Sequence, residues 1–513
     1  MSTSTDWNAI LNQQFGTPVK SEDELASALD QLSIAAPEPP KQEQQSREQE
    51  EEEPTTYVVM QPGCTRHRFI RNMKELIFVV ERPERVRAVQ CGVAAAVVRV
   101  EEHHQTAIGI RHSTRLLPLA DPLLARVHSS AHLKNVQDWS AQSIDALSER
   151  GCELPPECPT GDLYVCPDTR HAIEAALGCV ADAVDTVTRG EGRRAFAVLR
   201  PPGHHCEHET AMGFCFVNNV MAGIHYAHER YGVNRAVIFD IDLHHGNGTQ
   251  DIVWKSNKIQ ANLHGDKGLK IFYGSLHDIL SYPCESGDDE CIQAASLCLM
   301  SHSQYIWNVH LEPWKSLAHH DQLYSERYAV LFEKAREFLE KTRNGTERVL
   351  VWISCGMDAC EHEHESMQRH GRSVPTEFYH RFAQDAAKLA REAGAGLVSV
   401  LEGGYRDRAL VAGALAHVSG LALSGKDMKR EDESAVKQWW ELKELEQIEA
   451  TLLKGEKISS GFLTRCACIL GAIEAENTKY LAANSLLTPT HLPGRNRRVK
   501  DKEPVRRSPR ARG

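Results

Sequence analysis

Short apolar runs rich in β-branched residues alternate with helical stretches through the middle of the chain, and this alternation limits the possible folds more than any other feature. The strand-like runs are residues 196–199, 236–241, 270–276, 349–354 and 396–401. Helical patterns lie between or beside them, at residues 171–188, 218–231, 326–341 and 377–392. Buried strands separated by helices are typical of a mostly parallel sheet with helices on both faces. We therefore predict an α/β fold whose ligands bind beyond the carboxyl ends of the strands.

The two ends of the chain differ from this middle in composition and in the sign of their charge. Residues 1–55 are acidic and rich in Gln and Pro, whereas residues 486–513 are strongly basic. Both contain too little apolar surface to form a core, so we expect disordered tails there. Between them we expect a main domain at residues 56–425 and a helical appendage at residues 426–485. Within the appendage, one amphipathic helix should include Trp439, Trp440 and Leu442, and a second should cover residues 463–481.

The distribution of apolar residues also bears on where the protein acts. The opening residues 1–7 lack the apolar segment of a signal peptide, and no stretch reaches the roughly 18 apolar residues of a membrane span. We expect a protein of the nucleus, or of nucleus and cytoplasm, without a membrane partner. Its fifteen cysteines are then expected to be reduced thiols. The basic tail fits a nuclear import signal or direct contact with nucleic acid, and it fits a solvated tail equally well.

The densest group of reactive side chains follows the run at residues 236–241. Asp240, Asp242 and His244 are spaced by two, so on an extended strand they point to the same side. A hydrolytic metal site needs three protein ligands and a free position for water. Asp242 and His244 supply two ligands, and Asp358, just after the run at residues 349–354, is the candidate for the third. Taken alone, Asp358 would be better interpreted as a helix cap.

A second group of reactive side chains follows the run at residues 196–199. His204 and His205 come after two prolines and a glycine that fix a rigid turn. Adjacent imidazoles suit acid-base chemistry because their pKa lies near neutrality, although a surface histidine cluster would be the more common interpretation. Tyr405 follows two glycines at the last strand end, where its hydroxyl could donate to an oxyanion, although a lone Gly-Gly-Tyr would be interpreted as an ordinary turn.

Together these segments resemble the catalytic core of the zinc-dependent histone deacetylases, within the arginase and deacetylase superfamily. The motifs are residues 200–219, 237–252, 354–359 and 401–405, in this order, and the resemblance covers about residues 82–425. It implies that residues 56–425 form a deacetylase catalytic domain. Asn247 in the sequence His-His-Gly-Asn-Gly is similar to the class II form, and the pattern is closest to a divergent fungal branch of that class.

The resemblance implies a metal site and a set of catalytic roles. Asp242, His244 and Asp358 would bind zinc. A structural potassium ion would be bound by backbone or side-chain oxygens of Asp240, Asp242, His244, Ser275 and Leu276.

Two histidines and a tyrosine would then carry the hydrolysis of an acetylated lysine. His205, hydrogen-bonded to Asn247, would act as general base and then as general acid. His204, paired with Asp240, would support the transition state, and Tyr405 would stabilise the oxyanion.

Three further residues would bind the substrate. Phe214 and Tyr282 would line a tunnel for the lysine methylenes, and the carbonyl of Gly213 would accept the substrate amide proton. Around this tunnel the chain departs from the family pattern. Residues 284–305 contain only one glycine, and residues 360–370 replace the usual glycine-rich stretch with acidic and histidine residues. His362 and His364 there suggest a second metal site or, more simply, a solvated acidic loop.

Three functions are compatible with these residues. The first is hydrolysis of acetyl-lysine in histones or other proteins, with a role in chromatin regulation and transcriptional repression, as a homodimer or within a corepressor complex. The second is deacetylation of small acetylated amines. The third is a catalytically silent chromatin scaffold, against which stands the presence of every expected catalytic side chain.

Overall fold

The computed structural model describes residues 55–72, 79–104, 107–158, 162–264, 268–425 and 430–484. The two tails expected to be disordered, residues 1–55 and 486–513, lie outside the described residues except for Thr55. No helix of the described segments is both long and apolar enough to cross a membrane.

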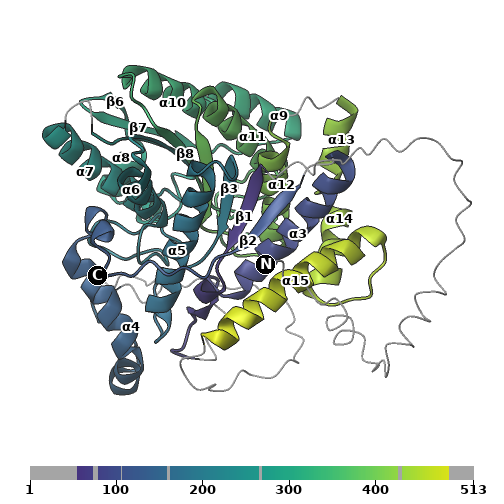
Figure 1. The fold of residues 1–513 in the computed structure, drawn as a ribbon, viewed down its shortest axis with the longest axis horizontal. Coiled ribbons are helices and arrows are strands. Elements are labelled where there is room, and N and C mark those ends of the chain that lie inside the picture. The colour runs from purple at the N-terminus through teal and green to yellow at the C-terminus, as the bar shows by residue number, and fades with distance from the viewer. Residues whose placement is uncertain are drawn as a thin grey trace, which may run out of the picture. The chain divides into compact units, whose positions relative to one another are not determined.

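A nine-stranded sheet forms the centre of the described part of the chain, in the order β2-β1-β3-β9-β8-β4-β5-β7-β6 (Figure 1). All neighbours are parallel except β6 and β7 at one edge. The predicted α/β fold is therefore confirmed. The strands are β1 (Thr56–Met60), β2 (Ile108–His112), β3 (Arg194–Val198), β4 (Arg235–Asp240), β5 (Lys270–His277), β6 (Cys298–Ser301), β7 (Gln304–His310), β8 (Val349–Cys355) and β9 (Gly396–Leu401).

Helices cover both faces of this sheet. The longer ones are α3 (Glu84–His104), α4 (Ser130–Arg150), α5 (Thr169–Thr188), α6 (Asn219–Tyr231), α7 (Asn247–His264), α10 (Val330–Lys341), α11 (Glu377–Glu392), α12 (Asp407–Leu423) and α15 (Gly461–Ala483). The shorter ones are α8 (Asp289–Ala295), α9 (Leu317–Leu323), α13 (Arg430–Gln438) and α14 (Leu442–Ile448), with the helical turns η1 (Pro62–Arg66), η3 (Pro122–Arg126), η5 (Cys284–Ser286), η6 (Tyr324–Tyr328) and η7 (Glu449–Leu453).

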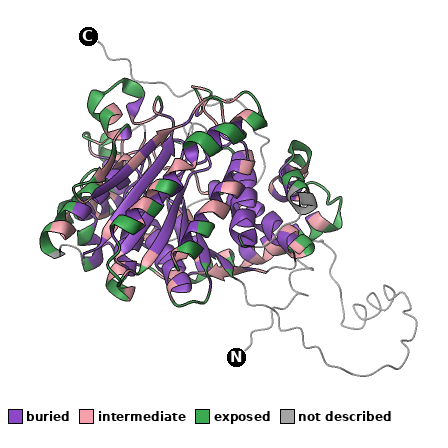
Figure 2. Ribbon diagram, turned by 90° about the horizontal axis from the view of Figure 1, so that it is seen from above, coloured by how far each residue is buried: buried purple, intermediate pink, exposed green. Residues whose placement is uncertain are grey.

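The hydrophobic core has two layers because successive strand residues point to opposite faces. In β4, Val237 and Phe239 join the cluster formed with α3, α10, α11 and α12, whereas Ala236 and Ile238 join the cluster formed with α4, α5 and α6. Figure 2 shows the buried strands between helices whose outer faces are exposed. The central strands are consequently apolar on both sides, which is why they form continuous hydrophobic runs in the sequence.

The helices after residue 429 extend the first of these core layers. Leu463, Cys466 and Leu470 of α15 are buried in the cluster that contains α3 and α12. The prediction of one helix through Trp439, Trp440 and Leu442 is wrong, since the two tryptophans lie in a turn between α13 and α14. The turn directs the two rings to different neighbours, Trp439 to His103 at 5.5 Å and Trp440 to His380 at 5.4 Å.

A buried ion pair fixes the segment that leaves β3. Arg200 donates from Nε to Glu81 Oε1 at 2.8 Å and from Nη2 to Oε2, and both side chains are fully buried. Arg85 of α3 and the hydroxyl of Tyr164 also donate to this carboxylate, at 3.0 and 2.8 Å. Burial alone would raise the pKa of Glu81, but the two guanidinium groups hold it well below its usual range. The network thus anchors the start of the His204–His205 turn to α3.

Removal of one member of this buried network should be costly. We expect Arg200→Met to lower the free energy of unfolding by about 3–5 kcal/mol, because it leaves the Glu81 carboxylate buried without its main partner. The matched control is Arg82→Met, whose ion pair with Asp407 is partly exposed, and it should cost less than about 1 kcal/mol. Urea unfolding followed by circular dichroism measures both values, and equal losses would contradict the assigned role of the network.

Candidate active site

Four adjacent strands, in the order β3-β9-β8-β4, bring the predicted functional motifs to one edge of the sheet. Because these strands are parallel, their carboxyl ends lie together. The segments that follow them are residues 199–208 after β3, 402–405 after β9, 356–358 after β8 and 241–247 after β4. Neighbouring strands separated widely in the sequence therefore supply the candidate site.

The three candidate metal ligands converge at this edge. One donor atom each from Asp242, His244 and Asp358 lies within 4.8 Å of the others, and all three residues are buried. His244 Nδ1 is 2.9 Å from Asp358 Oδ2 and 3.1 Å from Asp242 Oδ1. Asp242 is 2 residues and Asp358 is 114 residues from His244 in the sequence, and the three side chains can nevertheless contact a single atom.

The surroundings of these donors fit a small cation. A Cβ atom at Gly356 would lie 1.9 Å from Asp242 Oδ2, and one at Gly403 would lie 2.5 and 2.6 Å from the Oδ2 atoms of Asp242 and Asp358. The carboxylates are therefore packed against bare backbone in a space that admits no further side chain. Two buried carboxylates repel each other unless a positive charge lies between them. The arrangement of two oxygen donors and one nitrogen donor suits a divalent metal ion.

The adjacent histidines have different hydrogen-bond partners. His204 Nδ1 donates to Asp240 Oδ2 at 3.2 Å, and the Tyr273 hydroxyl donates to the same oxygen at 3.1 Å. Burial alone would lower the pKa of His204, but Asp242 and Asp240 raise it to about 10. Burial lowers the pKa of His205 well below its ordinary value, and the neighbouring His204 lowers it further. One imidazole therefore favours the cationic form and the other the neutral form.

The protonated nitrogen of His205 follows from the groups around Asn247. Asn247 Nδ2 donates to Glu207 Oε1 at 2.9 Å, and a carboxylate only accepts hydrogen bonds. This contact turns Asn247 Oδ1 toward His205 Nδ1, at 2.9 Å, so that Nδ1 must carry the hydrogen. His205 Nε2 then has a free lone pair, which is the requirement for a general base. Glu207 was not among the predicted residues, although it lies within the predicted motif.

Glu402 holds the backbone of the histidine turn and was also missed by the sequence analysis. Its Oε2 accepts hydrogen bonds from Gly203 N at 2.7 Å and His204 N at 3.2 Å, and its Oε1 accepts from Ser354 Oγ at 2.9 Å. The sequence feature that could have drawn attention to Glu402 is its position directly before the two glycines that precede Tyr405. These contacts span 48 and about 200 residues, so no local pattern could reveal them.

Gly213, Phe214 and Tyr282 lie around the same site. A Cβ atom at Gly213 would lie 2.4 Å from the His205 ring, so only glycine fits against that imidazole. Phe214 has a φ of 67°, an unfavourable conformation for a bulky residue, and its N–H donates to Asp162 O at 2.9 Å. The Tyr282 ring is centred 4.9 Å from the His205 ring. The ring of Tyr282 therefore lies edge-on to His205, on one of the chain segments predicted to form a tunnel, while the Phe214 ring lies beside Tyr405, 5.8 Å between centres.

Tyr405 lies on a segment tied directly to the metal-ligand cluster. Gly403 N donates to Asp242 Oδ2 at 2.9 Å, two residues before the tyrosine. The Tyr405 ring is centred 5.8 Å from that of Phe214, and the Arg85 guanidinium lies 5.0 Å from its centre. Tyr405 is 6% exposed, so its hydroxyl belongs to the buried site rather than to a surface turn.

A second group of potential metal ligands consists of His128, His132 and Cys206. Three of its four ring nitrogens have backbone hydrogen-bond partners. His128 Nε2 accepts from Asn218 N at 2.9 Å, which leaves Nδ1 to donate to Glu207 O at 2.9 Å. His132 Nε2 lies 2.8 Å from Phe216 O and must be protonated to bond there. These three nitrogens therefore stabilise the segment after His205 instead of offering lone pairs to a metal.

Two other features of the described chain lack catalytic character. The groups of three possible metal ligands found among the described residues include neither His362 nor His364.

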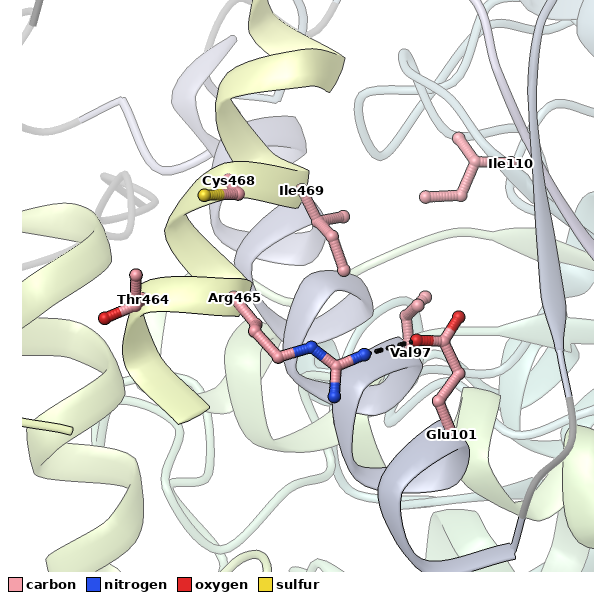
Figure 3. Close-up of a pocket in the computed structure, with 7 residues that line it drawn as sticks. All are labelled: Val97, Glu101, Ile110, Thr464, Arg465, Cys468 and Ile469. Carbon is pink, nitrogen blue, oxygen red and sulfur yellow. Dashed lines mark hydrogen bonds and ion pairs between the residues drawn. The ribbon is translucent and has the colours of Figure 1, made fainter. Parts of the chain in front are cut away.

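An open hollow of about 330 Å³ lies between α3, β2 and α15 (Figure 3). Its charged groups, Arg465 and Glu101, are 2.8 Å apart in an ion pair, and the rest of its lining is mainly apolar.

Comparison with known proteins agrees with the fold and with the motifs at the strand ends. The family model described as the histone deacetylase domain matches residues 79–421. The chain is 36% identical over 431 residues to the histone deacetylase HOS3 of Saccharomyces cerevisiae, covering 78% of this chain and 59% of the yeast protein. It is 35% identical over 164 residues to a histone deacetylase-like amidohydrolase of Pseudomonas aeruginosa, covering 32% of this chain and 40% of that protein.

A solved structure shows the same fold. The HD domain of HDA15 superposes with a TM-score of 0.52 at 23% identity, covering 78% of this chain and 99% of that domain. The family match extends over most of the described residues and includes every strand-end segment that forms the site. The chain therefore belongs to the histone deacetylase family.

Proposed function

We propose that this protein is a zinc-dependent hydrolase that removes acetyl groups from lysine side chains. The observation that carries the proposal is the convergence of Asp242, His244 and Asp358 beside two histidines with different protonation preferences. The family membership of residues 79–421 supports the same reaction. Zinc bound by the three ligands would polarise the acetyl carbonyl and activate water.

The residues around the ligands would carry out the proton transfers. His205, neutral and with Nε2 unprotonated, would accept a proton from water and later deliver it to the leaving lysine amine. His204, hydrogen-bonded to Asp240, would stabilise negative charge in the transition state. Tyr405 would donate its hydroxyl proton in a hydrogen bond to the oxyanion that develops on the acetyl carbonyl. This assignment gives each of these three side chains a separate task in the reaction.

The substrate would enter as an extended side chain. Phe214 and Tyr282 offer apolar surface to the lysine methylenes, and the Gly213 carbonyl would accept the amide hydrogen of the acetylated side chain. A structural potassium ion is proposed beside this site. Asp240 pairs with Ser275 across β4 and β5, which supports a site formed by oxygens of these residues together with Asp242, His244 and Leu276.

We also propose a class, a substrate, a cellular role and domain boundaries for this protein. Asn247 supports class II character, because an amide rather than a carboxylate accepts from His205. Acetylated histones are the proposed substrates, in the nucleus, with a role in repressing transcription and with self-association or a corepressor complex as the proposed assembly. We propose residues 56–425 as the catalytic domain and residues 426–485 as its helical appendage.

Loss of one metal ligand should abolish both binding and catalysis. In Asp242→Asn we expect zinc to fall from about one ion per chain to background, because a neutral amide is a weak ligand for zinc. Deacetylation of an acetyl-lysine peptide should be lost in parallel. The control is Asp321→Asn, whose side chain is 57% exposed. Elemental analysis and peptide turnover give the two results, and retained turnover in Asp242→Asn would refute the ligand assignment.

The hydroxyl of Tyr405 should affect the chemical step alone. We expect Tyr405→Phe to lower kcat by about 10²–10³-fold with little change in KM, because the hydroxyl contacts the oxyanion only in the transition state. Zinc content should equal that of the wild type. Steady-state kinetics with an acetyl-lysine peptide test this, and a change confined to KM would assign the tyrosine to substrate binding instead.

The substrate class can be tested by direct competition. We expect kcat/KM for an acetyl-lysine peptide to exceed that for an acetylated polyamine, since the backbone of a peptide can contact residues at the site entrance in addition to the buried channel. The reverse order would favour deacetylation of small amines. If the purified protein binds no zinc and turns over neither substrate, the scaffold function is favoured.

A further inference from the structure

The segment at residues 360–370 departs from the family pattern and contains one carboxylate that is unlike the others. Glu361 and Glu365 are exposed, whereas Glu363 is only 3% exposed. Burial raises the pKa of Glu363 to about 7, and backbone N–H groups hydrogen-bonded to the carboxyl group limit that rise. The side chain therefore has partners that offset its burial.

The partners of Glu363 are backbone N–H groups next to the proposed catalytic tyrosine. Oε2 accepts from Tyr405 N at 2.7 Å, and Oε1 accepts from Arg406 N at 2.8 Å. Oε1 also accepts from His364 N at 2.8 Å, which fixes the carboxylate on its own loop. One glutamate thus holds two successive amides of the segment between β9 and α12.

The same segment is held on its carbonyl side by a cation. Arg85 donates to the carbonyl oxygens of Glu402 and Gly404, and its guanidinium lies 5.0 Å from the centre of the Tyr405 ring. Gly404 has a φ of 108°, so the chain turns sharply just before the tyrosine. Because Arg85 binds carbonyls and Glu363 binds amides, the backbone of Tyr405 is fixed from two sides.

The loop that carries Glu363 is itself attached to the core and to the opposite side of the site. Gln368 Nε2 donates to the carbonyls of Asp358 and Cys360 at 2.9 and 2.6 Å. His370 Nδ1 lies 2.8 Å from Asp278 Oδ2, four residues before Tyr282. The loop is therefore a rigid support from which Glu363 can act on Tyr405.

We propose that Glu363 is a positioning residue for Tyr405, fixing the tyrosine hydroxyl where the oxyanion develops. The inference rests on the proposed function. A displacement of about 1 Å at a reacting group can lower a rate by about 10²-fold. The altered sequence of this loop accordingly contributes to catalysis and is more than a solvated acidic insertion.

Replacement of the carboxylate by an amide tests the positioning role. Glu363→Gln places an N–H donor against a backbone N–H, and we expect kcat to fall about 10–100-fold while KM and zinc content stay within about twofold of the wild type. Glu365→Gln, two residues away and exposed, should leave kcat unchanged. A Glu363→Gln enzyme with kcat within about twofold of the wild type would overturn the inference.

A double-mutant cycle separates positioning from general destabilisation. In the Tyr405→Phe background, Glu363→Gln should cause little further loss of kcat, because the hydroxyl that it positions is already absent. Equal losses in the two backgrounds would show that Glu363 acts independently of the tyrosine, and would overturn the inference. Glu363→Asp, which keeps the charge but is one methylene shorter, provides a second variant if the amide variant does not fold.

Hydrogen exchange tests the contact without reference to catalysis. The amides of Tyr405 and Arg406 should be protected in the wild type and should exchange at least about tenfold faster in Glu363→Gln, with no change in Glu365→Gln. If the wild type hydrolyses acetyl-lysine but the Tyr405 and Arg406 amides are protected equally in Glu363→Gln, the inference about Glu363 is overturned and the proposed function stands. An inert wild type with altered protection would overturn the proposed function and leave the structural contact intact.

Discussion

The burial of two carboxylates in one small space is the interaction on which the rest of the site depends. Asp242 and Asp358 follow the neighbouring parallel strands β4 and β8, and the repulsion between their carboxylates must be offset in the folded protein. The backbone supplies part of the compensation. Asp242 accepts from the amides of His244 and Gly403 at 3.0 and 2.9 Å, and Asp358 accepts from Leu243 N at 3.0 Å. A bound cation would supply the remaining compensation. The two buried carboxylates thus destabilise the empty site and favour binding of a positive ion.

The two adjacent histidines show how partners, rather than residue type, determine chemical roles. Both are buried, yet His204 faces a carboxylate and His205 faces an amide oxygen. A carboxylate stabilises the imidazolium, whereas an amide oriented by Glu207 fixes a neutral tautomer. The pKa of His204 is raised and that of His205 is lowered, so a single dipeptide offers one imidazole suited to carry charge and one suited to act as a base.

Buried carboxyl groups recur one layer away from the candidate metal ligands, and there they maintain geometry. The carboxylates of Glu81, Glu363 and Glu402 each bind groups on a different catalytic segment: the Arg200 guanidinium, the amides beside Tyr405, and the amides of the histidine turn. Each is almost fully buried, so each contact acts in a region of low dielectric, where hydrogen bonds to a charge are strong. The loops of the site are consequently tied to the core by buried hydrogen bonds.

The sequence alone determined the central strands, several helices and the residues of the four candidate motifs, because these depend on local periodicity and on short spacings such as Asp242 to His244. Strands β1, β2, β6 and β7 were not predicted, since short strands outside the central apolar runs owe their pairing to neighbours elsewhere in the chain. The split at Trp439 likewise follows from packing against α3 and α11. Only the tertiary structure decided that Glu363 and Glu402 serve the site, because their partners lie 42 and about 200 residues away. Local preference can specify a strand end, but contacts between distant segments exist only after the sheet has brought those ends together.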